Sequence, residues 1–193
     1  PYSSAALDHG NLLHRWFEEG DDFLELLVSP PPQFLTSTGL VGKEGERWAK
    51  NEAPEGAVIV SPKERAQILA EVAAVSGHPA AAELRAAAAE HEISVYWETA
   101  DGDRLKCRFD QMTHDGLAVD LKTTREQDIL ASWWKAVIDF RYHLQDAWYQ
   151  QGMEAMGLVA QPLRFIVVST SLPHDVQVVT LPAALVEIGR AHV

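Results

Sequence analysis

Two neighbouring stretches in which every second residue is apolar constrain the fold of this chain most strongly. They are residues 104–111 (RLKCRFDQ) and residues 117–122 (LAVDLK). A period of two is typical of β-strands that bury one face. The residues between the two stretches, Thr113-His114-Asp115-Gly116, are typical of a tight turn. The sequence therefore predicts an antiparallel hairpin with one apolar face and one polar face.

The rest of the chain alternates between helical and extended patterns. Helices are predicted at 7–19, 61–77, 79–91 and 129–157, with a break near Ile138, and further strands at 93–97, 164–170 and 175–181. Residues 29–45 hold three consecutive prolines and three glycines, which predicts a loop. These elements predict an α/β fold with a central mixed β-sheet flanked by helices. We expect one domain over residues 1–193, with N-terminal helices up to residue 92 and a sheet-and-helix core from residue 93.

Composition narrows the class of protein. The chain has 193 residues, 47% of them hydrophobic, which is enough for a buried core. Its formal net charge of −12 argues against binding nucleic acid over the whole surface, although a local basic surface can still hold phosphate. A single cysteine, Cys107, excludes an internal disulfide framework and metal sites built on several cysteines. No apolar run is long enough for a membrane helix, and the expected location is a reducing cytoplasm.

The polar face of the predicted hairpin gathers three charged residues. If the turn is centred on Asp115, Asp110 lies directly opposite Asp120, with the two β-carbons ~5 Å apart. Lys122 projects from the same face because it is two residues from Asp120. A folded protein tolerates two apposed carboxylates if one of them is protonated, if a cation lies between them or if both point into solvent. The cation would make this patch a divalent-metal site with a lysine beside it. The alternative is a solvated face, which many antiparallel hairpins have.

The helix that follows the hairpin presents a second polar set. Arg141, Gln145 and Tyr149 are spaced four residues apart and therefore share one helix face. By itself this pattern also fits an amphipathic helix in which Tyr149 is partly buried. We interpret the nearby Trp133 and Trp134 as residues that pack in the core or border a subunit rather than stack on bases.

Together these motifs resemble those of the PD-(D/E)xK nucleases. Within that superfamily the chain is most similar to the RecB-like group, and there to the nuclease domain of RecE-type exonucleases (exodeoxyribonuclease VIII). The stretches that carry the resemblance follow one another in family-like order: GNLLH at 10–14, ISVYW at 93–97, CRFD at 107–110, VDLKTT at 119–124, YHLQDAWY at 142–149 and VSTS at 168–171. The second acid is Asp120, where many members of the superfamily have glutamate, but aspartate is common in the RecB-like group.

The resemblance implies a metal site with named ligands. The side chains of His14, Asp110 and Asp120 and the backbone carbonyl of Leu121 would bind Mg²⁺, for which Mn²⁺ could substitute. The residue types agree with this, because hard oxygen ligands and a histidine suit these cations. A bound cation lowers the pKa of a coordinated water and neutralises charge on phosphate oxygens.

The resemblance also implies roles for three further residues and a reaction. Lys122 would orient or activate the attacking water, while Gln145 and Tyr149 would support the site and the scissile strand. The implied activity is exonucleolytic hydrolysis of linear double-stranded DNA, 5′ to 3′, which leaves 3′ single-stranded tails for recombination.

The implied assembly is a homo-oligomeric ring, with a tetramer favoured, that encircles DNA and works beside a single-strand-annealing recombinase. Such a ring would reconcile the negative charge with DNA binding if basic groups faced the channel; the candidates are Lys43, Arg47, Arg125, Lys135 and Arg141. Two alternatives remain. One is another RecB-like nuclease for repair, CRISPR adaptation or restriction, although the missing cysteines argue against its iron–sulfur members. The other is a non-catalytic domain that binds DNA ends.

Overall fold

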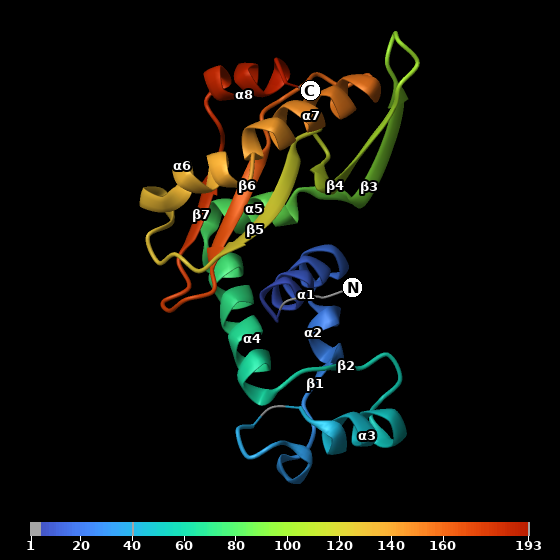
Figure 1. The fold of residues 1–193 in the computed structure, drawn as a ribbon, viewed down its shortest axis with the longest axis vertical. Coiled ribbons are helices and arrows are strands. Elements are labelled where there is room, and N and C mark those ends of the chain that lie inside the picture. Colours follow the sequence, from blue (N-terminus) through green and yellow to red (C-terminus); the bar gives the residue numbers. More distant parts are fainter. Residues whose placement is uncertain (1–4, 40, 193) are drawn as a thin grey trace. The chain divides into compact units, whose positions relative to one another are not determined.

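The computed structural model describes residues 5–39 and 41–192 (Figure 1). Contacts within the chain group it into two units, residues 1–73 and residues 74–193. The single domain expected over residues 1–193 therefore stays a prediction. No helix in the described part of the chain is long and apolar enough to cross a membrane.

The first unit is mainly helical. It contains α1 (Ala5–Glu19), α2 (Asp22–Leu26), the short 3-10 helix η1 (Pro32–Phe34), α3 (Lys43–Glu52) and most of α4 (Pro62–Gly77). Strands β1 (Leu27–Val28) and β2 (Val58–Ile59) pair in parallel. The predicted helices at 7–19 and 61–77 are confirmed by α1 and α4.

The loop predicted at 29–45 is wrong at its end, because α3 begins at Lys43. The prolines and glycines of this region led to the error. A β-carbon at Gly45 would lie 3.0 Å from the carbonyl oxygen of Phe34, which is closer than side chains normally approach. Gly45 therefore lets α3 pack against η1, and this tertiary contact outweighs the low helix propensity of glycine.

The second unit is built on a five-stranded mixed sheet with the order β3-β4-β5-β6-β7. Its strands are β3 (Ala88–Glu98), β4 (Arg104–Thr113), β5 (Ala118–Thr124), β6 (Arg164–Ser169) and β7 (Val176–Val179). Only the β5–β6 pair is parallel; the other neighbouring strands are antiparallel. The predicted α/β fold with a central mixed sheet is confirmed, and it is consistent with a PD-(D/E)xK-like core.

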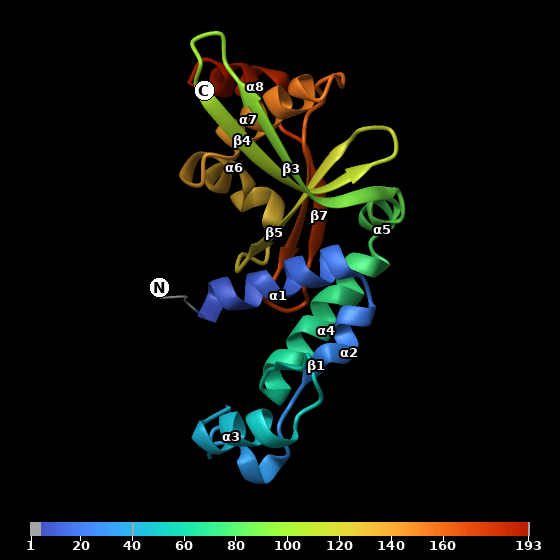
Figure 2. The same cartoon turned by 90° about the vertical axis from the view of Figure 1, so that its right-hand side faces the viewer.

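Helices cover both faces of this sheet. They are α5 (Pro79–Ala86), α6 (Ile129–Asp139), α7 (Tyr142–Ala155) and α8 (Ala183–Arg190). Figure 2 shows α6, α7 and α8 on one side of the strands and α5 on the other. The predicted break in the 129–157 helix is confirmed, and it lies at Phe140 and Arg141, between α6 and α7.

The helix predicted at 79–91 is wrong in its second half. Helix α5 ends at Ala86, and residues 88–91 already belong to β3. Alanine and glutamate in this stretch favour a helix, but Glu90 and His91 pair with Met112 and Gln111 of β4. Pairing with β4 satisfies the backbone hydrogen-bonding groups and extends the sheet, so it overrides the weak local preference for a helix.

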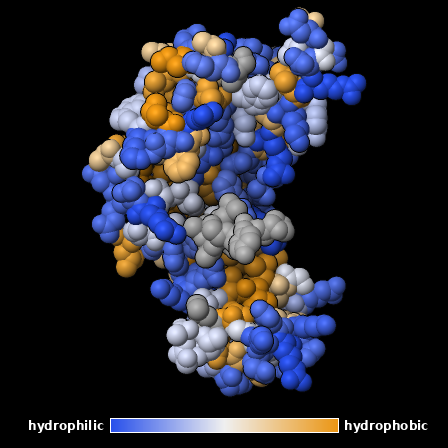
Figure 3. Space-filling view, viewed as in Figure 1, coloured by the Kyte–Doolittle hydropathy of each residue, from blue (hydrophilic) through white to orange (hydrophobic). Residues whose placement is uncertain are grey.

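Helix α8 was not predicted. Its eight residues pack on α7, and a β-carbon at Gly189 would lie 2.2 Å from the carbonyl oxygen of His143. The close approach of the two helices depends on this glycine. The α8 side of the unit is also where Figure 3 shows apolar residues gathered on an otherwise largely hydrophilic surface, and Ile188 is among the exposed large hydrophobic residues.

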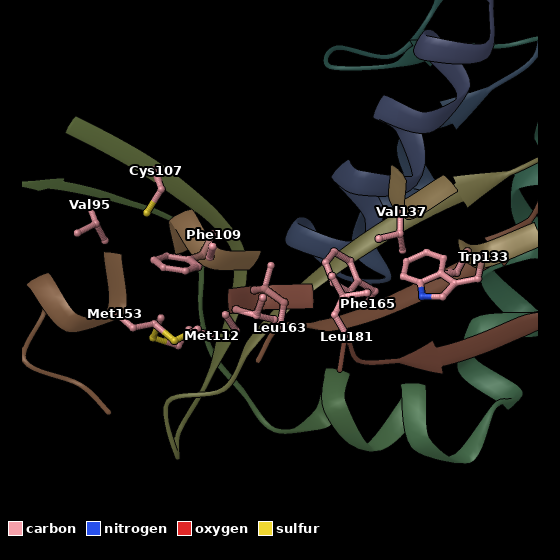
Figure 4. Packing of buried hydrophobic residues seen from close by; sticks show 14 of the residues in the cluster. Val95, Cys107, Phe109, Met112, Trp133, Val137, Met153, Leu163, Phe165 and Leu181 are labelled. Carbon is pink, nitrogen blue, oxygen red and sulfur yellow. The ribbon is translucent and has the colours of Figure 1, made fainter. Parts of the chain in front are cut away.

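The core of the second unit lies between the sheet and the helices α6 and α7. Figure 4 shows Trp133 beside Phe165, and their ring centroids are 5.5 Å apart. The prediction that Trp133 packs in the core is therefore confirmed. Cys107 is buried as expected, and burial raises the pKa of its thiol to about 11. A thiol in this state is unreactive at neutral pH, which fits a structural role.

Candidate active site

The predicted hairpin is present with the predicted register. Gln111 pairs with Val119 and Met112 pairs with Ala118, so the residue numbers of each pair sum to 230, as a turn centred on Asp115 requires. The β4–β5 ladder ends at the Gln111–Val119 pair. Asp110 and Asp120 are the next residues on the two strands, and thus lie where β4 leaves β5.

Asp110 replaces the missing ladder bond with its side chain. Its Oδ2 accepts a hydrogen bond from the backbone N–H of Leu121, at 3.1 Å. The carboxylate of Asp110 is in this way fixed beside the residue that follows Asp120. The first predicted acid and the second are therefore brought together by a direct contact between their strands.

Asp120 does not lie on a solvated face. Only 1% of this residue is exposed, so the alternative interpretation of the polar face is wrong at this position. The two carboxylate oxygens have different partners. Oδ2 lies 2.6 Å from Nζ of Lys122, and Oδ1 accepts a hydrogen bond of 2.5 Å from the side-chain amide of Gln145 on α7. Burial of the charge is thus offset by an ion pair and a hydrogen bond.

Lys122 is largely enclosed as well. Its side chain is 20% exposed, and Nζ lies 5.1 Å from the centroid of the Tyr142 ring. The ammonium group therefore lies between a carboxylate and an aromatic face, both of which attract a cation. Tyr142 was missed in the sequence, although its position three residues before Gln145 on the same helix was a usable signal.

The alternation of side chains between the two faces of the sheet is interrupted in β4 at Asp110. Phe109 packs edge-on against Tyr149 of α7, with ring centroids 4.9 Å apart, whereas the Gln111 amide donates to the carbonyl of Leu84 in α5. Residues 109 and 111 would share a face in a regular strand, but here they contact helices on opposite sides of the sheet. The predicted period of two would place Phe109 on the apolar face of the hairpin, opposite to Asp110. This is wrong, because a pure period of two does not include such an irregularity.

Gln145 and Tyr149 both lie at the site. The Tyr149 hydroxyl donates to the backbone carbonyl of Arg108, at 2.7 Å. Its pKa is raised, first by burial and then by the negative charges of Asp120 and Asp110. Tyr149 is accordingly a neutral donor at physiological pH. Arg141, the third member of the predicted face, is exposed at the start of α7.

His14 lies in α1 of the first unit, whereas the other predicted site residues lie in the second unit. Its role as a metal ligand therefore stays a prediction, as does the role of the Leu121 carbonyl.

Whether this site could hold a divalent cation depends on the donor atoms that its residues supply. Within residues 5–39 and 41–192, no group of three or more His, Cys, Asp or Glu side chains is close enough to hold a metal ion. Asp110 and Asp120 nevertheless supply adjacent hard oxygen donors of the kind that Mg²⁺ prefers. The Asp120 oxygen beside Lys122 already has a cationic partner. The residues of the second unit therefore fit a divalent cation in donor type and supply part of a ligand set.

Asp146, next to Gln145 on α7, is a buried acid that sequence reasoning missed. Its Oδ1 accepts hydrogen bonds from the Gln150 side chain at 2.9 Å and from the Leu163 N–H at 3.2 Å. Burial raises its pKa above the ordinary value of 3.8, although these bonds and the charges of Arg164 and Arg190 oppose the shift. The residue anchors α7 to the start of β6, and thereby positions Gln145 and Tyr149.

The raised pKa makes the stability contribution of Asp146 dependent on pH. A group whose pKa is higher in the folded state stabilises the fold fully below its unfolded pKa and loses this contribution as pH rises through the folded pKa. Asp146→Asn removes this loss. The melting temperature of the variant relative to wild type should therefore rise as the pH increases above the ordinary carboxyl pKa of about 4. Thermal denaturation across a pH series measures this difference in melting temperature. Asp101→Asn, at an exposed turn, is the matched control for net charge. A difference that stays constant or falls would contradict the assignment.

The fold and the acid–lysine arrangement define a PD-(D/E)xK-like domain. The chain belongs to the family described as PDDEXK-like domain of unknown function (DUF3799), whose profile matches residues 1–193. A search of curated proteins finds no match.

Among solved structures, the chain is similar to one described as a "Putative exonuclease" from Eubacterium rectale. The superposition has a TM-score of 0.61 at 16% sequence identity. It covers 100% of this chain and 64% of that protein, so the chain spans less than two thirds of the length of that relative. At this level of identity, the likeness shows a shared fold.

Proposed function

We propose that the chain is a metal-dependent DNA exonuclease that hydrolyses phosphodiester bonds in linear double-stranded DNA. The observation that supports this most is the buried Asp120 carboxylate, held by Lys122 and Gln145 beside Asp110. Apolar residues of similar size often stabilise a core as well as a buried ion pair does. A reaction that needs these charges therefore accounts for their position better than stability does.

Each of these side chains has a distinct task in the proposal. Lys122 orients the attacking water and counters the negative charge that develops on the phosphate. Gln145 holds Asp120 in one orientation through its amide. Tyr149, a neutral phenol anchored on the Arg108 carbonyl, supports the strand that carries Asp110. We do not assign a proton-abstracting role to Tyr149, because burial and two nearby carboxylates oppose its ionisation.

The proposed metal ligands are His14, Asp110, Asp120 and the Leu121 carbonyl, and the proposed cation is Mg²⁺ or Mn²⁺. When bound, the cation would lower the pKa of a coordinated water and neutralise charge on the phosphate oxygens. The chain's own residues position the carboxylates and keep the lysine beside them.

The finer parts of the proposal come from the resemblance to RecE-type nucleases. They are 5′ to 3′ polarity, the production of 3′ single-stranded tails for recombination, a homo-oligomeric ring with a tetramer favoured, and a single-strand-annealing recombinase as partner. The basic residues proposed for the channel are all exposed: Lys43, Arg47, Arg125, Lys135 and Arg141. Lys135 also pairs with Asp139 on its own helix, which reduces what it could contribute to phosphate binding.

The likeness to the protein from Eubacterium rectale, which is described as a putative exonuclease, agrees with this proposal. A repair or restriction nuclease of the RecB-like group would share the same acids and lysine and would differ in the form of DNA that it cuts. A non-catalytic domain would bind DNA ends without cutting them. The form of DNA that is degraded therefore distinguishes the three functions, and it can be measured by comparing linear with covalently closed circular duplex in Mg²⁺ and in EDTA.

A further inference from the structure

The corner between α6 and α7 exposes an aromatic ring next to the proposed active site. Phe140 follows the last residue of α6 and is 69% exposed. The next residue, Arg141, has a φ of 57°, in the left-handed region that residues other than glycine seldom adopt. Such conformations cost free energy and often occur at functional sites. The corner thus presents an exposed ring and an exposed guanidinium group on a strained turn.

The exposed ring is the end of a stack that begins in the core. Phe140 lies on Tyr142 with ring centroids 5.7 Å apart and an interplanar angle of 27°. Tyr142 lies on the buried Trp133 with centroids 5.5 Å apart and an angle of 28°. The three rings are therefore nearly parallel to their neighbours, and the stack holds Phe140 in a defined orientation instead of leaving it free in solvent.

The same stack borders Lys122. The Lys122 Nζ lies 5.1 Å from the centroid of the Tyr142 ring, which is the middle ring of the stack. A pocket lies at this place, and its lining includes Lys122, Ser132, Trp133, Phe140 and Tyr142. The lining therefore combines aromatic faces with an ammonium group and a hydroxyl.

We propose that Phe140 stacks on an unpaired nucleobase of the DNA strand whose phosphate lies at Asp120 and Lys122. The inference rests on the proposed nuclease function and adds a subsite to it. Base stacking on an aromatic ring tolerates any sequence, because every base has a π-face. A base inside a duplex has both faces covered by its neighbours, so the subsite selects a frayed or single-stranded end. Arg141 lies beside it to meet a neighbouring phosphate.

The rest of α6 argues for a nucleobase over a protein partner at this corner. The other large exposed apolar residues of the helix are Leu130, Trp134 and Ile138, which recur every fourth residue and so form a separate stripe. These three residues are not among those that line the pocket, whereas Phe140 is. A protein that bound α6 would cover this stripe, while a nucleotide at Lys122 would meet Phe140.

The test uses short single-stranded DNA that carries the fluorescent base 2-aminopurine at one position in turn, bound to the full chain in EDTA. Stacking on Phe140 should quench the probe at one position in wild type and not in Phe140→Ala, and Phe140→Trp should keep the quenching. The affinity for this single-stranded DNA should fall about 10-fold in Phe140→Ala. An abasic nucleotide at that position should remove the difference between wild type and variant, because the two changes delete the same contact. Trp134→Ala removes an exposed ring of the same helix outside the pocket and should behave as wild type.

Quenching that is equal in wild type and Phe140→Ala would overturn the subsite, and so would the same loss in Trp134→Ala. The measurement needs no catalysis, so it distinguishes the two hypotheses. A wild-type protein that quenches through Phe140 but cuts no DNA with Mg²⁺ or Mn²⁺ would keep the subsite and overturn the nuclease function.

Discussion

Replacing Asp120 with asparagine should abolish DNA cleavage while leaving the fold in place. The change removes one buried negative charge but keeps an oxygen that can still accept the Gln145 amide. Lys122 loses its carboxylate partner, and the proposed cation loses a ligand. Cleavage should fall below detection, and the rise in melting temperature that Mn²⁺ produces in wild type should disappear, since a cation that binds only the folded state stabilises it. Thermal denaturation with and without Mn²⁺ and a linear-DNA assay measure both effects.

The matched control for this variant is Asp139→Asn. Asp139 is an exposed carboxylate of α6 that also pairs with a lysine, Lys135. Its replacement should leave both cleavage and the effect of Mn²⁺ unchanged, because exposed ion pairs contribute little. If Asp120→Asn kept wild-type turnover, Asp120 would have no place in the reaction. If wild type showed no stabilisation by either cation, the metal site would be wrong.

Replacing Lys122 with alanine should lower the cleavage rate by about 10²-fold or more, because the group proposed to orient the attacking water is lost. The structure adds a second effect. Asp120 is 2% exposed at its side chain, so removing the lysine leaves a buried carboxylate without its cationic partner. This should lower the unfolding free energy in EDTA by on the order of 3 kcal/mol. Mn²⁺ should recover most of that loss, because the cation supplies the missing positive charge.

This recovery of stability without recovery of rate separates a role in the reaction from a role in folding. Urea denaturation and single-turnover cleavage, each with and without Mn²⁺, measure the two quantities. Lys106→Ala is the control, because Lys106 is an exposed lysine of β4 that has no part in the proposed site, and its replacement should change neither quantity. Near-wild-type turnover in Lys122→Ala would remove this residue from the mechanism.

The hairpin was predictable because its signals are local. The period of two and the turn chemistry at 113–116 are sufficient to place Asp110 next to Asp120, and the observed ladder has that register. The period of two could not show that the alternation of side chains in β4 is interrupted at Asp110. This interruption depends on Phe109 packing against α7 and on Gln111 binding α5. The burial of Asp120 was equally hidden, since it depends on helices that follow later in the chain.

Elements that depend on tertiary contacts were predicted least well. Residues 88–91 resemble a helix in composition but pair with β4, and α3 and α8 both pack through a glycine that a sequence pattern treats as a helix breaker. Asp146 and Tyr142 were missed for a related reason. A single buried acid or aromatic residue on an amphipathic helix produces no periodic pattern in the sequence. Asp146 contacts Leu163 and Tyr142 contacts Lys122, and both contacts join different elements of the fold.

The most direct test of the account compares linear duplex DNA with covalently closed circular duplex, each incubated with the full chain in Mg²⁺ and in EDTA. If the proposed exonuclease forms the proposed ring, linear DNA is degraded only with Mg²⁺ and closed circles survive, because a closed ring can admit a duplex only at an end. Degradation should also weaken steeply with added salt, since phosphate contacts release counterions. Rapid cutting of closed circles would contradict the exonuclease and favour a repair or restriction nuclease, and binding of ends without degradation in Mg²⁺ or Mn²⁺ would contradict catalysis altogether.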